Sequence, residues 1–322
     1  MKGLLCALFA VGGALAGVHT AFAAETYPAR PIRWIVPYPP GGTTDILARI
    51  MGQWLSEHLN QQVLIDNRPG AGNNIGTEIA IRSTPDGYTV FLVNPANAIN
   101  ATLYTKLPFD FLKDMAPVGG MVRVPNVMEV TNSLPAKSIP EFITYAKANP
   151  GKVILASSGA GTSVHLSGEL FMSMTGVKMT HVPYKGAGPA FPDLIGGQVH
   201  VMFDNMPSSI EFIRGGKLRA LGVTTAKRSD QLPNVPTVSE TVPGYEASAW
   251  FGMSAPKGTP RAAIDVLNRE MNRALADPRM KARLAELGGD PISGTPEQFW
   301  KIHTFETDKW AKVVKSSGAK VD

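Results

Sequence analysis

The stretch Trp34-Ile-Val-Pro-Tyr-Pro-Pro-Gly-Gly-Thr-Thr-Asp-Ile-Leu-Ala-Arg49 joins an apolar segment to a helical pattern through a turn of prolines and glycines. We expect a strand over residues 33–37 and a helix that begins near Thr43. The unpaired N–H groups at this helix start, with the hydroxyls of Thr43 and Thr44, favour an anion at the carboxyl end of the strand. A strand–turn–helix corner without a ligand, in which Thr43 is the N-cap of the helix, explains the same residues equally well.

The composition of this turn narrows the kind of anion. It has no lysine of a phosphate-binding P-loop, and Gly-Gly-Thr-Thr is not a dinucleotide fingerprint. A small carboxylate is therefore the better hypothesis. Asp45 stands at the helix start, four residues before Arg49, so helix-dipole compensation and a pair one turn apart give it a structural role.

The first 23 residues have the pattern of a cleavable secretory signal. Lys2 precedes an apolar run over residues 4–18, and Ala21-Phe22-Ala23 places small residues where signal peptidase cuts. Neither this run nor any later segment has the uninterrupted apolar length, about 20 residues, that a membrane span needs. We expect export to the periplasm, with no membrane insertion of the mature chain.

Charge and cysteine content exclude several classes of protein. Cleavage removes Lys2 from the 31 basic residues, which leaves 30 against 26 acidic ones and a formal net charge of +4. The basic residues are scattered, so we expect no nucleic-acid partner. Cys6 is the single cysteine and lies in the signal, so the mature chain must be stabilised by its core without disulfides.

Along the mature chain, strand-like segments alternate with glycine-rich turns and helical periodicity, which is typical of an α/β fold. Several strands are apolar throughout, as parallel strands covered on both faces are. The expected strands are residues 32–37, 63–67, 89–93, 118–122, 128–131, 153–157, 179–182, 199–203, 218–223 and 250–255. The expected helices include 45–59, 75–82, 139–148, 165–174 and 189–195, and residues 260–315 are mostly helical.

This α/β plan runs twice, over residues 30–123 and 137–225, before the chain returns in a last helical block. We therefore expect two α/β lobes, with residues 24–123 and 247–322 in the first and residues 124–246 in the second. Ligands of open α/β sheets bind beyond the carboxyl ends of the strands, so the cleft between the lobes is the expected ligand site. Hinge closure through the crossings would bury the ligand.

Several motifs resemble the periplasmic solute-binding proteins of tripartite tricarboxylate transporters, the Bug receptors. The motifs run in order through the chain: Gly41-Gly-Thr-Thr-Asp45, Asn67-Arg-Pro-Gly-Ala-Gly72, Pro85-Asp-Gly-Tyr88, Ser158-Gly-Ala-Gly-Thr162, Val182-Pro-Tyr-Lys-Gly186, Asp204-Asn205 and Trp250-Phe-Gly252. The resemblance implies a type II periplasmic-binding fold, with a cleft between two lobes. It also implies delivery of a dicarboxylate, tricarboxylate or aromatic acid to a two-subunit membrane permease. We expect a monomer without cofactor or metal.

The candidate ligand-binding residues lie at the strand ends and turns of both lobes. In the first lobe they are Tyr38, Gly41, Gly42, Thr43, Thr44, Asn94 and Asn97. In the second lobe they are Ser157, Ser158, Gly161, Thr162, His165, Tyr184, Ala187, Gly188 and Asp204. Each has a structural alternative: Asn94 is equally a turn signal, His165 is equally a packed histidine, and the alternative for Asp204 is a cap of the helix after it.

Two other classes of function stay open at this stage. A periplasmic sensor that hands its ligand-bound form to a signalling receptor would share the same fold. A Ser158–His165–Asp204 hydrolase triad can be drawn, although the chain has no G-x-S-x-G elbow and no H-E-x-x-H metal motif. We expect no enzyme.

Overall fold

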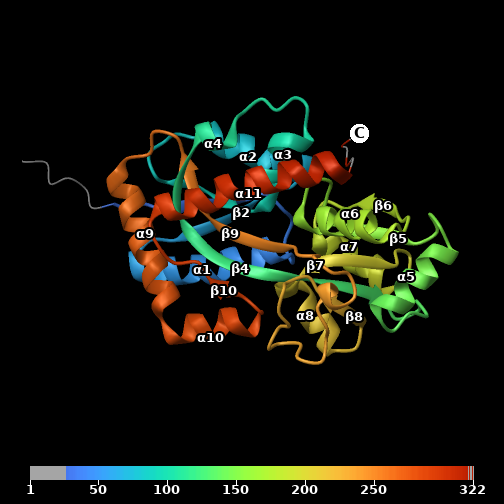
Figure 1. The fold of residues 1–322 in the computed structure, drawn as a ribbon. Helices are drawn as coiled ribbons and strands as arrows, with labels where there is room; N and C mark the ends of the chain where they lie inside the picture. Colours follow the sequence, from blue (N-terminus) through green and yellow to red (C-terminus); the bar gives the residue numbers. More distant parts are fainter. Residues whose placement is uncertain (1–26, 318, 320, 322) are drawn as a thin grey trace, which may run out of the picture.

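A computed structural model describes residues 27–317, 319 and 321 of the chain (Figure 1). The predicted signal at residues 1–23 lies outside these described residues. Within them, ten strands form one mixed sheet, and helices cover both of its faces (Figure 1).

The first half of the sheet contains three parallel strands, in the order β2 (Val63–Asn67), β1 (Ile32–Val36) and β3 (Thr89–Val93). Strand β9 (Ser248–Pro256) pairs antiparallel with β3, and the first part of β4 (Met115–Thr131) pairs antiparallel with β9. The returning strand β9 thus lies inside the sheet, between segments that are far apart in the sequence.

The second half repeats this arrangement. Strands β6 (Thr180–Pro183), β5 (Ile154–Ser157) and β7 (Val201–Asn205) are parallel neighbours. The second part of β4 lies antiparallel between β7 and β8 (Leu218–Val223), and the short strand β10 (Asp290–Pro291) pairs with the first part of β4.

Strand β4 is continuous through both halves. The sequence predicted two separate strands, at 118–122 and 128–131, and this is wrong because the residues between them are also paired. Pro125 pairs with Ser248 of β9, and the next residue, Asn126, pairs with Asn205 of β7. The predicted boundaries of the two lobes, at residues 123/124 and 246/247, stay a prediction.

Helices cover the first half because its strands are apolar on both sides. On β1, Trp34 packs with Leu47 and Leu267 on one face, and Ile35 belongs to the core on the other face. The first face carries α1 (Thr43–Leu59), α9 (Arg261–Ala276) and α10 (Pro278–Glu286). The second face carries α2 (Asn74–Ile81), α3 (Pro95–Leu103) and α11 (Pro296–Ser317).

The second half is covered in the same way. Helices α5 (Ile139–Ala148) and α6 (Ser163–Thr175) pack on one face, and α7 (Ala187–Ile195) and α8 (Met206–Arg214) pack on the other. Three short helices complete the chain: η1 (Ala71–Asn73), α4 (Phe111–Asp114) and η2 (Val238–Glu240). The predicted α/β alternation is confirmed.

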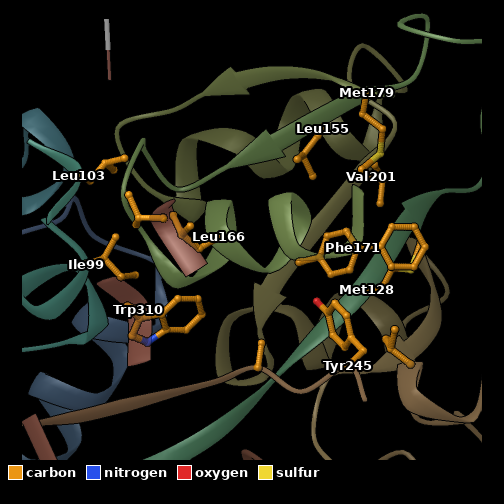
Figure 2. Packing of buried hydrophobic residues seen from close by; sticks show 14 of the residues in the cluster. Ile99, Leu103, Met128, Leu155, Leu166, Phe171, Met179, Val201, Tyr245 and Trp310 are labelled. Atoms are coloured by element: carbon orange, nitrogen blue, oxygen red, sulfur yellow. The ribbon is translucent and has the colours of Figure 1, made fainter. Parts of the chain in front are cut away.

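The last helix, α11, packs against both halves. Its Trp310 is 1% exposed and shares a core with Ile99 and Leu103 of α3 and with Leu166 of α6, as Figure 2 shows. The C-terminal helix therefore closes the hydrophobic core across the junction of the two halves.

We expect Trp310→Ala to destabilise the protein by about 3–5 kcal/mol, because it leaves a large cavity in this core. Phe305→Ala is the control on the same helix, since Phe305 is 67% exposed and its loss should change stability by less than about 0.5 kcal/mol. Urea unfolding followed by circular dichroism measures both. Equal effects of the two substitutions would contradict the bridging role of Trp310.

Candidate functional site

The first turn of the predicted site joins β1 to α1. Gly41 has a φ of +88°, and Gly42 is the N-cap of α1, with no side-chain hydrogen bond that caps the helix. Thr43 and Thr44 follow as the first helical residues, and both are buried. The first N–H groups of α1 thus have no side-chain acceptor, as the anion hypothesis requires.

Asp45 holds this turn from within the helix. Its carboxylate accepts hydrogen bonds from the Gly41 N–H at 3.1 Å and the Asn67 amide at 3.1 Å, and it forms an ion pair with Arg49 at 2.8 Å. Burial acts to raise the pKa of Asp45, but the hydrogen bonds from Arg49, Gly41 and Asn67 outweigh it, so this pKa is lowered. The predicted Asp45–Arg49 pair is confirmed.

The second turn joins β5 to α6. Thr162 is the N-cap of α6: its hydroxyl accepts from the His165 N–H at 3.2 Å and donates to the Gly159 carbonyl at 2.8 Å. Gly161 has a φ of +81°, and a Cβ atom there would lie 2.1 Å from Oδ1 of Asn100, on α3 of the first half. Only glycine fits here, because the two halves meet at this point.

The third turn joins β6 to α7 and touches the first turn. A Cβ atom on Gly188 would lie 2.7 Å from the Pro40 carbonyl oxygen, and one on Gly42 would lie 3.8 Å from the Cβ atom of Ala187. The glycine-rich turns of the two halves therefore face each other at van der Waals distance.

Between these turns lies a cavity of about 30 Å³, the space of a single water molecule. Its polar groups are hydroxyls, amides and one carboxylate, and none of the described residues that line it is a lysine, arginine or histidine. The lining consists of Tyr38, Gly42, Thr43, Thr44, Asn94, Pro95, Ser158, Thr162, Ser163, Ala187, Asp204, Asn205 and Phe251.

Nine of the sixteen candidate residues line this cavity: Tyr38, Gly42, Thr43, Thr44, Asn94, Ser158, Thr162, Ala187 and Asp204. Asn94 does so while it also caps α3, because its side chain accepts from the Ala96 N–H at 3.1 Å. Asp204 does not cap α8, whose N-cap is Asn205; its carboxylate instead accepts a hydrogen bond from Ser208 and lies 3.1 Å from the Ser209 hydroxyl. The role of all sixteen residues in ligand binding stays a prediction.

The other seven candidates are Gly41, Asn97, Ser157, Gly161, His165, Tyr184 and Gly188, and they lie outside the lining of this cavity. Asn97 completes the capping box of α3, with its side chain 3.0 Å from the Asn94 N–H. The hydroxyl of Ser157 lies 2.7 Å from Nε2 of His181, and the hydroxyl of Tyr184 donates to Asp193 at 2.6 Å. These polar groups are engaged within their own half of the protein.

Sequence reasoning missed four lining residues: Pro95, Ser163, Asn205 and Phe251. Three of them directly follow a predicted residue in the sequence, so extending each predicted turn by one residue would have included them. Phe251 comes from β9, far along the chain, and no local pattern distinguishes it from the other apolar residues of that strand.

A second, larger pocket of about 630 Å³ adjoins the cavity and shares Tyr38 and Ser158 with it. It carries the cations that the cavity lacks, Lys106 and Lys185, and also His181. Burial, followed by the nearby His165, lowers the pKa of His181 to about 3, so this ring is neutral at neutral pH.

The contacts of His165 do not support a Ser158–His165–Asp204 hydrolase triad. Its Nδ1 accepts from the Gly161 N–H at 3.3 Å, its Nε2 lies 3.3 Å from Glu169, and its ring stacks on His181 with a centroid distance of 4.0 Å. Both nitrogens are thus engaged away from Ser158, so His165 cannot act as its base. Among residues 27–317, 319 and 321, no group of His, Cys, Asp and Glu has the arrangement of a metal site.

Comparison with known proteins identifies the family. Residues 47–319 match the model of the tripartite tricarboxylate transporter family receptor. The chain is 41% identical to Protein BugT of Bordetella pertussis, over 98% of each chain.

The chain belongs to this receptor family. It is 40% identical to R. palustris Rpa4515, solved with adipate, with a TM-score of 0.90 over 92% of this chain and 100% of the other. It is 29% identical to MatC (Rpa3494) of Rhodopseudomonas palustris, solved with bound malate, with a TM-score of 0.85 over 89% and 100%.

These matches confirm the type II periplasmic-binding fold, in which two α/β lobes enclose a ligand cleft. Receptors of this family are periplasmic solute-binding proteins and not enzymes. Within the described part of the chain, no helix has the length and apolar character to cross a membrane.

We expect Asp45→Asn to lower stability at neutral pH by about 1–3 kcal/mol, because it removes a charge that accepts several hydrogen bonds. The folded pKa of Asp45 is lowered, so its contribution is present above the unfolded pKa and is lost as the pH falls through the folded pKa. The difference between the variant and the parent, measured by urea unfolding, should therefore shrink as the pH falls below about 4.

The matched control is Asp265→Asn on α9. Asp265 also forms a pair one turn apart, with Arg261 at 2.7 Å, but both side chains are exposed. Its loss should cost less than about 1 kcal/mol at neutral pH. An Asp45 effect that does not depend on pH would count against the electrostatic explanation.

Proposed function

We propose that this protein captures a small carboxylate in the periplasm and delivers it to a two-subunit membrane permease. The observation that carries the proposal is the convergence of three glycine-rich turns, from both lobes, on one cavity without a cation. Helix N-termini bind anions through N–H groups and the positive end of the helix dipole. A carboxylate fits such a site, and the hydroxyls of Thr43 and Ser158 add donors.

The similar receptors support the ligand class. Rpa4515 was solved with adipate and MatC with malate, and both compounds are small dicarboxylates. The cavity in this chain has room for one small group, so we propose that it holds one carboxylate. The rest of the ligand would extend past Tyr38 and Ser158 into the larger pocket, where Lys106 and Lys185 suit a second anionic group.

Ligand uptake in this proposal requires the lobes to open, because a cavity of about 30 Å³ is too small for a dicarboxylate. We propose residues 24–123 and 247–322 as one lobe and residues 124–246 as the other. The hinges would lie where β4 changes partners, at Pro125 and Asn126, and in the connection that leads to β9. We further propose that residues 1–23 direct export and are removed, and that the mature receptor is a monomer.

A thermal-shift panel on the mature protein tests the ligand class. The panel contains adipate, malate, citrate and benzoate, with glucose as a neutral control. A compound that binds only the native state stabilises it by about 2.7 kcal/mol at one hundred times its Kd, so at least one acid should raise Tm clearly. Stabilisation by glucose and by none of the acids would overturn the proposal.

A pair of glycine substitutions tests closure of the turns. Gly161→Ala should reduce affinity for the best acid of the panel more than tenfold in calorimetry, because its Cβ atom would collide with Asn100 across the cleft. Gly151→Ala is the control: Gly151 has a similar φ of +75°, but no atom lies within 4 Å of its added Cβ.

Both alanines carry a similar backbone strain, on the order of 1 kcal/mol. Gly161→Ala adds the collision with Asn100, so without ligand its unfolding midpoint should be the lower of the two. The difference in affinity then reports the contact across the cleft. Equal affinities of the two variants would show that the turn at Gly161 does not need to approach α3 when ligand binds.

A further inference from the structure

The cavity that we assign to a carboxylate contains a carboxylate of its own. Asp204 is 1% exposed and is the single acidic residue in the lining, which includes no lysine, arginine or histidine. Two like charges at short range in a poorly hydrated site repel each other strongly. An anionic ligand and a charged Asp204 would therefore repel each other at this distance, unless one of the two carboxyl groups carries a proton.

A second buried acid lies beside Asp204. Glu129 of β4 is fully buried, and its Oε1 accepts from the Ser209 hydroxyl at 2.9 Å. The same hydroxyl lies 3.1 Å from Oδ2 of Asp204, although it has one proton to donate. The Oε2 atom of Glu129 is buried and has no hydrogen-bond partner among the described residues. The site thus has too few donors to stabilise two charged carboxylates.

The hydroxyl of Ser208 connects this pair to the first lobe. It donates to Oδ2 of Asp204 and lies 2.8 Å from Oγ1 of Thr43, which lines the cavity from α1. The acid pair therefore contacts both the cavity and the helix start that would receive the ligand.

In the described part of the chain, no ion pair joins a cation to Asp204 or Glu129. Several charged residues on the elements around it are engaged with other partners: Asp45 with Arg49, Arg123 with Glu306, Glu169 with His165, Asp193 with Tyr184, Glu211 with Arg214, His200 with the Ile154 N–H, and Arg219 with the carbonyls of Leu134 and Ala136. Burial and the donors of Ser208, Ser209 and the Asn205 backbone act on Asp204, while burial, the charge of Asp204 and the Ser209 hydroxyl act on Glu129.

We propose that this receptor binds its carboxylate ligand together with one proton, which Asp204 takes up from solvent and then donates as a hydrogen bond to the ligand carboxylate. Asp204 thereby becomes a specificity-determining residue. It selects an acid that accepts a hydrogen bond over a ligand that presents an amine. This inference rests on the proposed function.

The proton balance gives the direction of the pH dependence. Burial, followed by the charge of Asp204, raises the pKa of Glu129 well above its usual range, which favours its protonated form. Burial also raises the pKa of Asp204 to about 6 in the free protein. An anionic ligand raises this pKa further, so the complex holds more protons than the free protein above about pH 6. Affinity should fall as the pH rises, by up to about tenfold per pH unit.

Calorimetry in two buffers with different ionisation enthalpies measures the protons taken up. The probe is the acid among adipate, malate, citrate and benzoate that raises Tm most, used at about pH 7, where carboxylic acids are ionised. We expect the uptake of close to one proton for each ligand bound. Binding without proton uptake would overturn the inference.

Two isosteric variants assign the proton. Asp204→Asn should bind the acid without proton uptake and with little dependence on pH. Glu129→Gln imitates a protonated Glu129, so it should retain the uptake. Uptake that persists in Asp204→Asn would also overturn the inference, and circular dichroism with Tm checks that both variants are folded.

The two proposals fail in different ways. If none of the four acids binds, the proposed function fails, and proton-coupled binding falls with it. If an acid binds and no proton is taken up, the carboxylate receptor stands and the role of Asp204 is wrong.

Discussion

The contact between the turn at residues 40–42 and the turn at residues 186–188 leaves no room for a side chain at Gly188. A Cβ atom on Gly188 would reach within 2.7 Å of the Pro40 carbonyl, and one on Gly161 would reach within 2.1 Å of Asn100. The lobes can approach this closely because glycine stands at these points. The approach brings the starts of α1, α6 and α7 to one cavity, so that backbone and hydroxyl groups, and not charged side chains, form its polar surface.

This form of recognition constrains the electrostatics of the site. Where an arginine pairs with a carboxylate, its charge supports the anion whatever the state of its neighbours. Here the lining includes no cation, and Asp204 lies among the donors. Dipoles and hydroxyls must then support any anion, and the protonation of the buried acid pair becomes part of the binding equilibrium. The larger pocket with Lys106 and Lys185 lies outside this region, where charges are better hydrated.

The connections between the lobes also bear on how the protein moves. Strand β4 changes partners from β9 to β7 between Pro125 and Asn126 without interruption, so the backbone is paired on both sides of this point. Helix α11 packs against α3 and α6 through Trp310 (Figure 2). Motion of the lobes must preserve these contacts or exchange them, which favours bending at a few backbone positions over independent movement of two domains.

Much of this arrangement follows from local sequence. Alternation of apolar runs with glycine-rich turns determined the α/β class, because strand and helix periodicities are properties of short segments. The Gly41-Gly42-Thr43 turn and the Asp45–Arg49 pair were predictable for the same reason, since capping and pairing one turn apart need no distant partner. The resemblance to the receptor family came from many such local motifs in order.

The tertiary structure alone decided which polar groups face the cavity. His165 and Ser157 belong to the right turn, yet they are engaged with neighbours inside their own lobe, while Phe251 arrives from a strand about two hundred residues after the first turn. Glu129 gave no signal in the sequence, because its importance comes from Asp204 and Ser209, which lie on other elements. The direction of a side chain depends on how whole elements pack, and the state of a buried acid depends on what that packing places beside it.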